Sequence, residues 1–176
     1  MVNKKFVITE ENAKEYCDVI GTWIKENIEN AHANGVVLGM TSGIDCSVVA
    51  GLCKNAGVNI NLVLLPYGKD MNKSKSYSDA MELINKFGFD YHMFDIKPAV
   101  DNIQISDDFI KDCNENNVKL AKANIRPRMR MTYLYQYAQI NNLLVIGTSN
   151  LSEYVTGYFT KFGDNAYDIN PIGNFT

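Results

Sequence analysis

The sequence is poor in histidine and has no excess of positive charge, and each shortage argues against a class of function. Its histidines are His32 and His92 alone, so a histidine-rich zinc site is not expected. Lys and Arg number 17 against 20 Asp and Glu, which gives a net charge of −3 at pH 7. Broad nucleic-acid surfaces need clustered positive charge. We therefore expect no nucleic-acid partner, although a local basic pocket for phosphate groups is compatible with this composition.

Paired cysteines and long apolar runs are also missing. The four cysteines lack CxxC spacing and lie at Cys17, Cys46, Cys53 and Cys113, which fits a reducing compartment better than a disulfide framework. The first ten residues contain no apolar leader segment, and no apolar run approaches the length of a membrane span. These absences predict a soluble, cytoplasmic protein with no membrane partner.

The residues that are present suit one globular domain. The chain has 176 residues, of which 46% are hydrophobic and 21% charged, both ordinary values for a folded protein. Chains of this length usually form a single core. No repeat, low-complexity tract or linker-like stretch divides the sequence, so we predict one domain over residues 1–176.

Short apolar runs alternate with stretches of helical spacing. The predicted strands are residues 36–38, 60–65, 91–94 and 143–146. The predicted helices are one that Thr9 caps and residues 47–56, 78–87, 106–116, 124–139 (with Pro127 in the first turn) and 151–156. This alternation predicts an α/β fold, a three-layer doubly wound parallel β-sheet with helices on both faces. Ligands of such sheets bind beyond the carboxyl ends of the strands, near a topological switch point.

The loop after the first predicted strand is the first motif that carries chemistry. It reads Gly39-Met40-Thr41-Ser42-Gly43-Ile44-Asp45-Cys46-Ser47. Backbone N–H groups at a helix N-terminus, together with the hydroxyls of Thr41, Ser42 and Ser47, suit a pyrophosphate. Asp45 would repel a phosphate unless it holds Mg²⁺, which binds carboxylates and phosphate oxygens together. The alternative is an ordinary capped helix whose dipole Asp45 complements, and the spacing alone does not decide between the two.

Two further segments concentrate charge. The segment after the fourth predicted strand contains Glu153, a candidate second metal carboxylate, and Lys161, a candidate phosphate-binding charge. By itself this segment is better interpreted as a capped helix with a solvated Lys. Arg126, Arg128 and Arg130 stand at alternate positions and cannot share one helical face, so a charged solvent face is the favoured interpretation of that cluster.

Taken in order, these pieces resemble the ammonia-dependent NAD synthetase family. They are residues 39–47, Leu65-Pro66-Tyr67-Gly68, residues 124–130, residues 147–153 and the stretch GYFTKFGDNAYDINPIG at 157–173. The last stretch is the most specific. The first loop alone would indicate only the wider ATP-pyrophosphatase superfamily, whose fold is called adenine nucleotide alpha-hydrolase-like. The resemblance covers nearly the whole chain.

The resemblance implies a five-stranded parallel sheet, a homodimer that shares the dinucleotide site, and the amidation of deamido-NAD to NAD with ammonia. ATP would be the co-substrate and Mg²⁺ the cofactor. The nicotinate carboxylate would attack the α-phosphate of ATP, pyrophosphate would leave, and ammonia would displace AMP from the adenylate. No glutaminase domain is visible in the sequence, so ammonia would be free or delivered by a separate glutaminase.

The resemblance also implies site residues. ATP contacts would be Gly39, Met40, Thr41, Ser42, Gly43, Ile44, Asp45, Cys46 and Thr148. Asp45 and Glu153 would hold magnesium, whereas Arg128, Lys161 and Asp168 would bind deamido-NAD. The catalytic set would be Asp45, Glu153 and Lys161. Because Gly157 favours a helix end, we also expect residues 158–167 to form a lid that carries Lys161 over the site and becomes ordered when substrate binds.

The sequence departs from the family pattern Ser-Gly-Gly-x-Asp-Ser in its first loop. Ser42 places a Cβ where a glycine allows positive φ or a close phosphate, and Cys46 replaces a hydroxyl by a weaker thiol donor. Leu64 stands where some members have an arginine. Family sequences also continue beyond the position of Thr176, so a shortened form that lacks the C-terminal part is expected.

Two other functions stay open at this point. One is a different ATP-pyrophosphatase ligase, such as a tRNA-thiolating or GMP-synthetase-like enzyme, which would favour paired catalytic cysteines or an RNA-binding extension. The other is a nucleotide-binding module without ligase activity, which Ser42 and Cys46 would favour.

Overall fold

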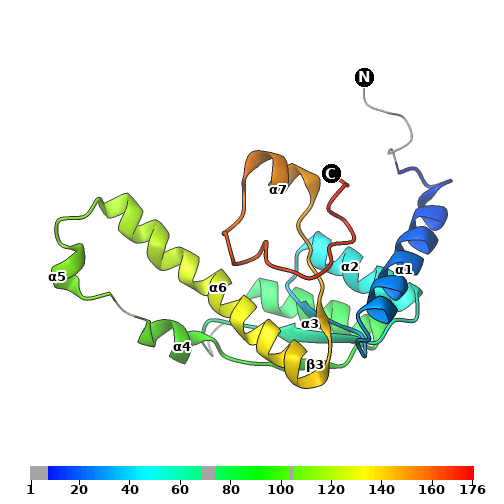
Figure 1. Cartoon of the computed structure of the whole chain (residues 1–176), viewed down its shortest axis with the longest axis horizontal. Coiled ribbons are helices and arrows are strands. Elements are labelled where there is room, and N and C mark those ends of the chain that lie inside the picture. The colour runs from blue at the N-terminus through cyan, green and yellow to red at the C-terminus, as the bar shows by residue number, and fades with distance from the viewer. Residues whose placement is uncertain (1–7, 69–73, 104) are drawn as a thin grey trace.

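The computed structural model describes residues 8–68, 74–103 and 105–176, and a parallel sheet forms its centre (Figure 1). Within these residues the sheet has four strands in the order β3-β2-β1-β4. The strands are β1 (Val36–Gly39), β2 (Ile60–Leu64), β3 (Tyr91–Met93) and β4 (Leu144–Val145). All three pairings are parallel. The predicted strands are therefore confirmed, each within one or two residues at its ends.

Alternate side chains of the strands point into two separate cores, one on each face of the sheet. Val36 and Leu38 join one core, in which α1 (Ala13–Asn30), α2 (Ile44–Asn55) and α3 (Lys75–Phe87) take part. Val37 joins the other, with α4 (Lys97–Asn102) and α6 (Glu115–Asn141). Strands buried on both faces are apolar throughout. The predicted three-layer α/β fold is confirmed.

The topological switch of the sheet lies between β1 and β4. From β1 the chain runs through α2 to β2 and through α3 to β3, always on the first face. It then crosses by α4, α5 (Asp107–Ile110) and α6 on the second face and returns beside β1. The connection that leaves β1 lies on the first face and the one that enters β4 lies on the second, and a crevice opens at the carboxyl ends of strands at such a point. The two loops singled out in the sequence follow these two strands.

One helix differs most from its prediction. Helix α6 runs unbroken over Glu115–Asn141, so the prediction of a helix from residue 124 with Pro127 in its first turn is wrong. The Asn114 side chain accepts hydrogen bonds from the N–H groups of Asn116 and Asn117, which starts the helix early. An interior proline removes one backbone hydrogen bond. Pro127 packs beside Gly163, where a Cβ on the glycine would lie 3.1 Å from the proline Cβ.

Other differences concern element ends. Thr9 does not cap α1, because its carbonyl accepts from the Ala13 N–H in a preceding turn and Asn12 takes the cap position. Helices α2 and α3 each begin three residues before their predicted starts, and α4 was not predicted. The predicted helix over 106–116 is reduced to the short α5 and the first residues of α6.

The implied fifth strand is represented by one parallel bridge. Ile146 pairs with Ile169 beside β4, and no fifth strand forms in the part of the chain that the structure describes. Figure 1 shows the other end of the molecule, where α4, α5 and the start of α6 extend to one side as an arm. Among the described helices, none combines the length and apolarity that a bilayer crossing requires.

Candidate functional site

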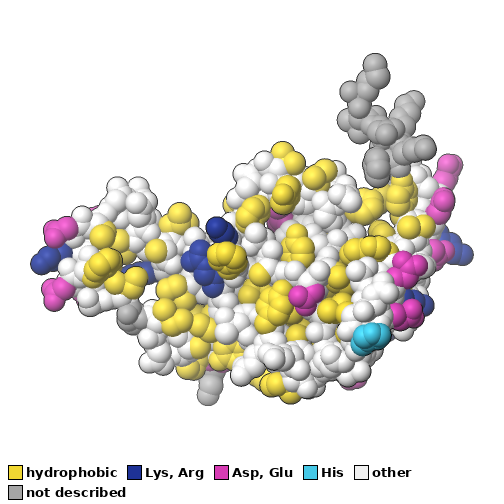
Figure 2. Space-filling model, viewed as in Figure 1, with side chains coloured by type: hydrophobic (Ala, Val, Ile, Leu, Met, Phe, Trp, Pro, Cys, Tyr) yellow, Lys and Arg dark blue, Asp and Glu magenta, His cyan; other side chains and the backbone are white. Residues whose placement is uncertain are grey.

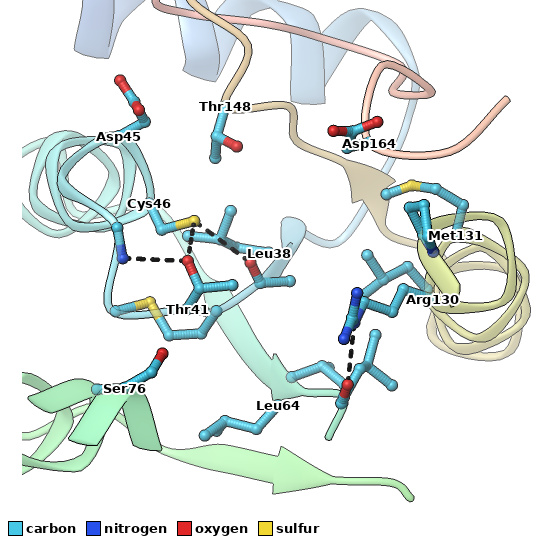
Figure 3. A pocket seen from close by; sticks show the side chains of 18 of the residues that line it. Leu38, Thr41, Asp45, Cys46, Leu64, Ser76, Arg130, Met131, Thr148 and Asp164 are labelled. Atoms are coloured by element: carbon cyan, nitrogen blue, oxygen red, sulfur yellow. Dashed lines mark hydrogen bonds between the residues drawn. The ribbon is translucent and has the colours of Figure 1, made fainter. Parts of the chain in front are cut away.

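A cavity of about 510 Å³ opens at the switch point, beyond the carboxyl ends of β1 and β4. Figure 3 shows Thr41, Asp45 and Cys46 on one wall and Arg130 and Met131 of α6 on the opposite wall. Thr148 and Asp164 lie along one side between these walls. The volume is in the range of small-molecule and cofactor sites. Both loops that the sequence singled out therefore meet at one cavity.

The first loop is organised by hydrogen bonds across its own turn. The Thr41 hydroxyl accepts a hydrogen bond from the Gly43 N–H at 3.1 Å and lies 3.2 Å from the Cys46 thiol. That thiol donates to the Gly39 carbonyl at 3.6 Å, so it joins the end of β1 to the first turn of α2. Gly43 is the N-cap of α2 and has no side chain to satisfy the first N–H groups of the helix. These donors suit an anion.

Ser42 and Ser47 do not take the places expected of them. Ser42 keeps a negative φ, since the described non-glycine residues with positive φ are His32, Asn142 and Phe162. Its hydroxyl lies 2.8 Å from the hydroxyl of Ser76 of α3, which does line the cavity. The Ser47 hydroxyl donates to the Gly43 carbonyl inside α2 at 3.0 Å. Of residues 39–46, all except Ser42 and Ile44 line the cavity.

The two predicted metal carboxylates line the same cavity from different loops. Asn150 lies between them: its Nδ2 donates to Asp45 Oδ1 at 3.4 Å, and its backbone N–H donates to Glu153 Oε2 at 3.1 Å. The Glu153 N–H donates in turn to Asn150 Oδ1, which makes a capping box at the start of α7 (Leu151–Thr156). Within the described residues, no Lys or Arg forms an ion pair with either carboxylate.

This donor set fits magnesium. Mg²⁺ prefers oxygen ligands and keeps several positions for water and substrate phosphates, so it does not need a cage of protein groups. Two half-buried carboxylates beside a helix N-terminus meet that requirement. No cluster of three or more potential metal ligands occurs in the described ranges.

The second loop is shaped by a close approach at Gly147. A Cβ on this residue would lie 2.5 Å from Cδ1 of Tyr167, so a glycine is required here. The Gly147 N–H donates to the Ile169 carbonyl at 2.7 Å. Thr148 follows directly and lines the cavity between Asp45 and Asp164, as Figure 3 shows.

The three predicted deamido-NAD contacts lie outside this cavity. Arg128 and Lys161 are exposed neighbours, joined by a 3.0 Å hydrogen bond from Arg128 Nε to the Lys161 carbonyl. The Lys161 ammonium lies 5.1 Å from the Phe162 ring centroid. Figure 2 shows basic side chains gathered over the middle of α6, where the chain after α7 reaches it. We call Arg128 and Lys161 the outer pair.

Asp168 differs from the outer pair because both of its carboxylate oxygens accept hydrogen bonds from the protein. Its Oδ2 accepts from the Val145 N–H at 2.7 Å, and its Oδ1 accepts from the Tyr135 hydroxyl at 3.3 Å. The carboxylate thus satisfies a backbone N–H group of β4, the last strand in the sheet order. Burial, with Asp168 nearby, raises the pKa of Tyr135 to about 12. In the structure, both oxygens of Asp168 are therefore used for protein contacts.

Residues 158–167 are fixed at several points, contrary to a lid that is loose without substrate. The Thr160 N–H donates to Asp164 Oδ1 at 2.6 Å, and the Thr160 hydroxyl donates to Asn124 Oδ1 of α6 at 3.0 Å. The Gly163 N–H bonds to the Thr160 carbonyl at 2.8 Å. These bonds join the segment to itself and to α6, which favours an ordered loop over a loose lid. Lys161 has no ion pair among the described residues and does not line the cavity.

The arginine cluster shows where sequence reasoning missed a site residue. Arg126 lies over the Tyr67 ring, 4.0 Å from its centroid, whereas Arg130 lines the cavity and donates from Nε to the Leu65 carbonyl at 3.0 Å. Arg126 and Arg130 contact the neighbouring residues Tyr67 and Leu65, whereas Arg128 contacts Lys161, so the three arginines do not share one face, as their spacing predicts. The interpretation as a solvated face is wrong for Arg130. No sequence pattern indicated that Arg130 faces a cavity, because only the fold brings the end of β2 beneath this turn of α6.

Comparison with known proteins places the chain among enzymes of one family. The family model described as NAD synthase matches residues 16–176. An NH(3)-dependent NAD(+) synthetase of Finegoldia magna is 38% identical over 164 residues, which cover 93% of this chain and 64% of the relative. The chain thus spans less than two thirds of the length of that curated relative.

Two solved structures give the same result at the level of the fold. An NH3-dependent NAD synthetase of Campylobacter jejuni, in complex with nitrate, aligns with a TM-score of 0.78 and 36% identity, over 93% of this chain and 68% of that one. An NMN synthetase of Francisella tularensis aligns with a TM-score of 0.77 and 34% identity, over 92% and 65%. With a family match over most of its length and a cavity built by the two family loops, this chain belongs to the NAD synthase family.

Proposed function

We propose that the protein amidates deamido-NAD to NAD, with ammonia as the nitrogen donor and ATP as the activating substrate. The observation that carries the proposal is the meeting of the two family loops at one cavity, with Asp45 and Glu153 both on its wall. A carboxylate is a poor electrophile, so a carboxyl oxygen must be turned into a leaving group before an amide forms.

The proposed chemistry has two steps. A nicotinate carboxylate oxygen attacks the α-phosphorus of ATP, the bond from that phosphorus to the bridging oxygen breaks, and pyrophosphate leaves. The nitrogen of ammonia then attacks the acyl carbon of the adenylate, AMP leaves with the acyl–oxygen electron pair, and the nitrogen loses a proton to water. Neither step needs a nucleophilic side chain, and catalysis rests on position and charge stabilisation.

In this proposal the cavity holds ATP. The N–H groups at the start of α2 bind the pyrophosphate part, and Thr148 contacts the nucleotide from the opposite loop. Asp45 and Glu153 hold Mg²⁺ with the help of Asn150, which fixes both carboxylates. Bound magnesium supplies charge neutralisation at the phosphates. Leu64, Leu65 and Pro66 give the cavity an apolar wall.

The outer pair is proposed to bind the dinucleotide. Arg128 and Lys161 lie together on the surface beside the cavity, so a substrate held there approaches ATP from outside. Asp168 is part of the same proposal, and its role there requires the Tyr135 hydroxyl or the Val145 N–H to share the carboxylate. A homodimer that completes the dinucleotide site belongs to the same proposal, as does cytoplasmic location.

A second candidate substrate is nicotinate mononucleotide. The structural similarity to the NMN synthetase of Francisella tularensis is as high as that to the Campylobacter enzyme, at TM-scores of 0.77 and 0.78. The acyl group and the ATP chemistry are the same for both substrates, so the cavity favours neither. The difference lies in the adenylate half of deamido-NAD, which only the outer pair would contact.

The deciding experiment measures amide formation by the purified chain with ATP, Mg²⁺ and ammonium. Deamido-NAD and nicotinate mononucleotide are supplied in parallel, and NAD, NMN and AMP are quantified by chromatography. We expect NAD and AMP in equal amounts from deamido-NAD. Faster NMN formation would select the second candidate. Glutamine replaces ammonium in a further reaction, which we expect to be inactive unless a glutaminase is added.

Two outcomes would overturn the ligase proposal. Binding of ATP without amide formation from either nucleotide would favour a nucleotide-binding module. Release of pyrophosphate that is stimulated by tRNA or by a purine nucleotide, and not by a nicotinate nucleotide, would favour a different ATP-pyrophosphatase ligase.

A further inference from the structure

The cavity has one cationic group among its described lining residues, and no role has been assigned to it so far. Asp45, Glu153 and Asp164 contribute carboxylates, whereas Arg130 contributes the guanidinium. A nucleotide triphosphate brings several more negative charges into the same space. Some positive group of the protein must face it in addition to any metal ion, since like charges in a partly dehydrated cavity repel strongly.

Arg130 is held so that part of its guanidinium is available to a ligand. A guanidinium has five N–H donors in one plane. Nε donates to the Leu65 carbonyl at 3.0 Å, and the described residues provide no other hydrogen bond to the group. The terminal amino groups therefore remain as a fork with fixed direction. Such a fork matches two oxygens of a phosphate group.

The surroundings make the charge of Arg130 costly without a ligand. The side chain is half-buried on the wall formed by α6 and β2. Burial and the nearby Arg126 lower the pKa of Arg130, while Asp164 acts in the opposite direction. The group stays protonated at neutral pH. An anion beside it would offset the loss of water around the charge.

The position of Arg130 indicates which substrate it contacts. Figure 3 shows Arg130 across the cavity from Asp45, with Leu64 below the space between them. The residues implied for ATP, apart from Ser42 and Ile44, line this cavity, whereas Arg128, Lys161 and Asp168 lie outside it. A nucleotide that extends from the α2 N-terminus towards β2 reaches the fork of Arg130.

We propose that Arg130 is an anion-binding residue of the active site, whose terminal amino groups bind a phosphate oxygen of ATP within the cavity. This inference rests on the proposed function for the identity of the nucleotide. It does not depend on which acid is amidated, because it concerns the ATP side of the cavity alone. Arg130 would hold that phosphate from the wall opposite the metal carboxylates.

The test compares Arg130→Gln and Arg130→Lys with the matched control Arg126→Gln. Arg126 is on the same helix, loses the same charge and lies over Tyr67 outside the cavity. Binding of ATP, AMP and adenosine is measured by calorimetry with Mg²⁺, without the second substrate. Thermal melting shows whether each variant is folded.

For Arg130→Gln we expect ATP affinity to fall by about tenfold or more, which corresponds to roughly 1.4 kcal/mol. Adenosine affinity should stay within about twofold of the wild type, since it has no phosphate. Arg130→Lys should recover part of the loss, and Arg126→Gln should behave as the wild type. AMP shows whether the α-phosphate is the group that is bound, because it keeps that phosphate alone.

Three outcomes would overturn the inference. Unchanged ATP affinity in Arg130→Gln would remove the phosphate contact. Equal losses for ATP and adenosine would mean that Arg130 only positions Leu65. Wild-type protein that binds no nucleotide would end both this inference and the ATP-dependent function. Normal ATP binding that depends on Arg130, without amide formation from either nicotinate nucleotide, would contradict the proposed function and support this inference.

Discussion

The loop at residues 39–47 and the loop at residues 158–168 both belong to the segments that resemble the family, yet they differ in how their backbone hydrogen-bond donors are used. In the first, Gly43 leaves the initial N–H groups of α2 without side-chain caps at the cavity. In the second, Thr160, Gly163 and Asp168 all bond to the protein. The difference teaches that the family signature contains both ligand-binding and scaffolding residues, since available donors suit a ligand and satisfied ones hold a shape.

The largest effect is expected from Asp45→Asn, which tests whether the first loop binds a ligand. If Asp45 holds magnesium, we expect amide formation to fall by about a hundredfold, close to 3 kcal/mol of barrier, because the metal neutralises charge in the transition state. The melting temperature should hardly change, since among the described residues the side chain of Asp45 accepts one hydrogen bond, from Asn150 at 3.4 Å. Steady-state rates against Mg²⁺ concentration measure the effect.

Asp79→Asn, an exposed change on α3, is the matched control for loss of a carboxylate. Wild-type rates and magnesium dependence in Asp45→Asn would exclude the metal role.

Lys161→Gln tests whether the outer pair binds the dinucleotide. We expect the KM for deamido-NAD to rise by about tenfold, roughly 1.4 kcal/mol, while the KM for ATP stays unchanged because Lys161 does not line the cavity. Initial rates with each substrate varied in turn separate the two constants. Lys122→Gln, an exposed change on α6, serves as the control for the loss of a positive charge.

A rise in the KM for ATP, with none for deamido-NAD, would place Lys161 on the other substrate. It would also mean that the segment moves far from its position in the structure.

Gly147→Ala tests the scaffold beneath the second loop. Its Cβ would lie 2.5 Å from the Tyr167 ring, so we expect a loss of about 1–3 kcal/mol in unfolding free energy from overpacking. Gly51→Ala is the matched change, because Gly51 lies within α2 with nothing inside 4 Å. That variant should gain up to about 1 kcal/mol from helix propensity. Urea denaturation of both variants measures the difference, and equal stabilities would contradict the close packing at Gly147.

The smallest effects are expected from Ser42→Gly and Cys46→Ser. Both restore the family pattern, and neither residue is strained in the structure. We expect ATP affinity to be kept or improved, with changes within about threefold, less than 1 kcal/mol. Calorimetric titration with ATP and Mg²⁺ is the measurement. A tenfold weaker affinity in either variant would show that the contacts of Ser42 with Ser76, or of Cys46 with Gly39, support the loop.

Much of the fold follows from the sequence alone. Apolar runs separated by helical stretches determine a doubly wound parallel sheet, because strands buried on both faces cannot alternate in polarity. The turn at Gly43, the helix stop at Gly88 and the start of α7 at Asn150 are local signals, and each of them is where such a residue is favoured. The family loops were recognisable because they are contiguous segments.

Only the tertiary structure decided which charged residues share a space. Asp45 and Glu153 are 108 positions apart, and they meet because β1 and β4 are neighbours in the sheet. Arg130 enters the cavity, while Arg128 does not, because the turn of α6 that carries Arg130 lies against Leu65, just after β2, and residues two apart on a helix point about 200° apart. Local spacing carries no record of which strand will lie beneath a helix. The position of a side chain relative to a cavity is therefore a property of the packed elements and not of the segment that contains it.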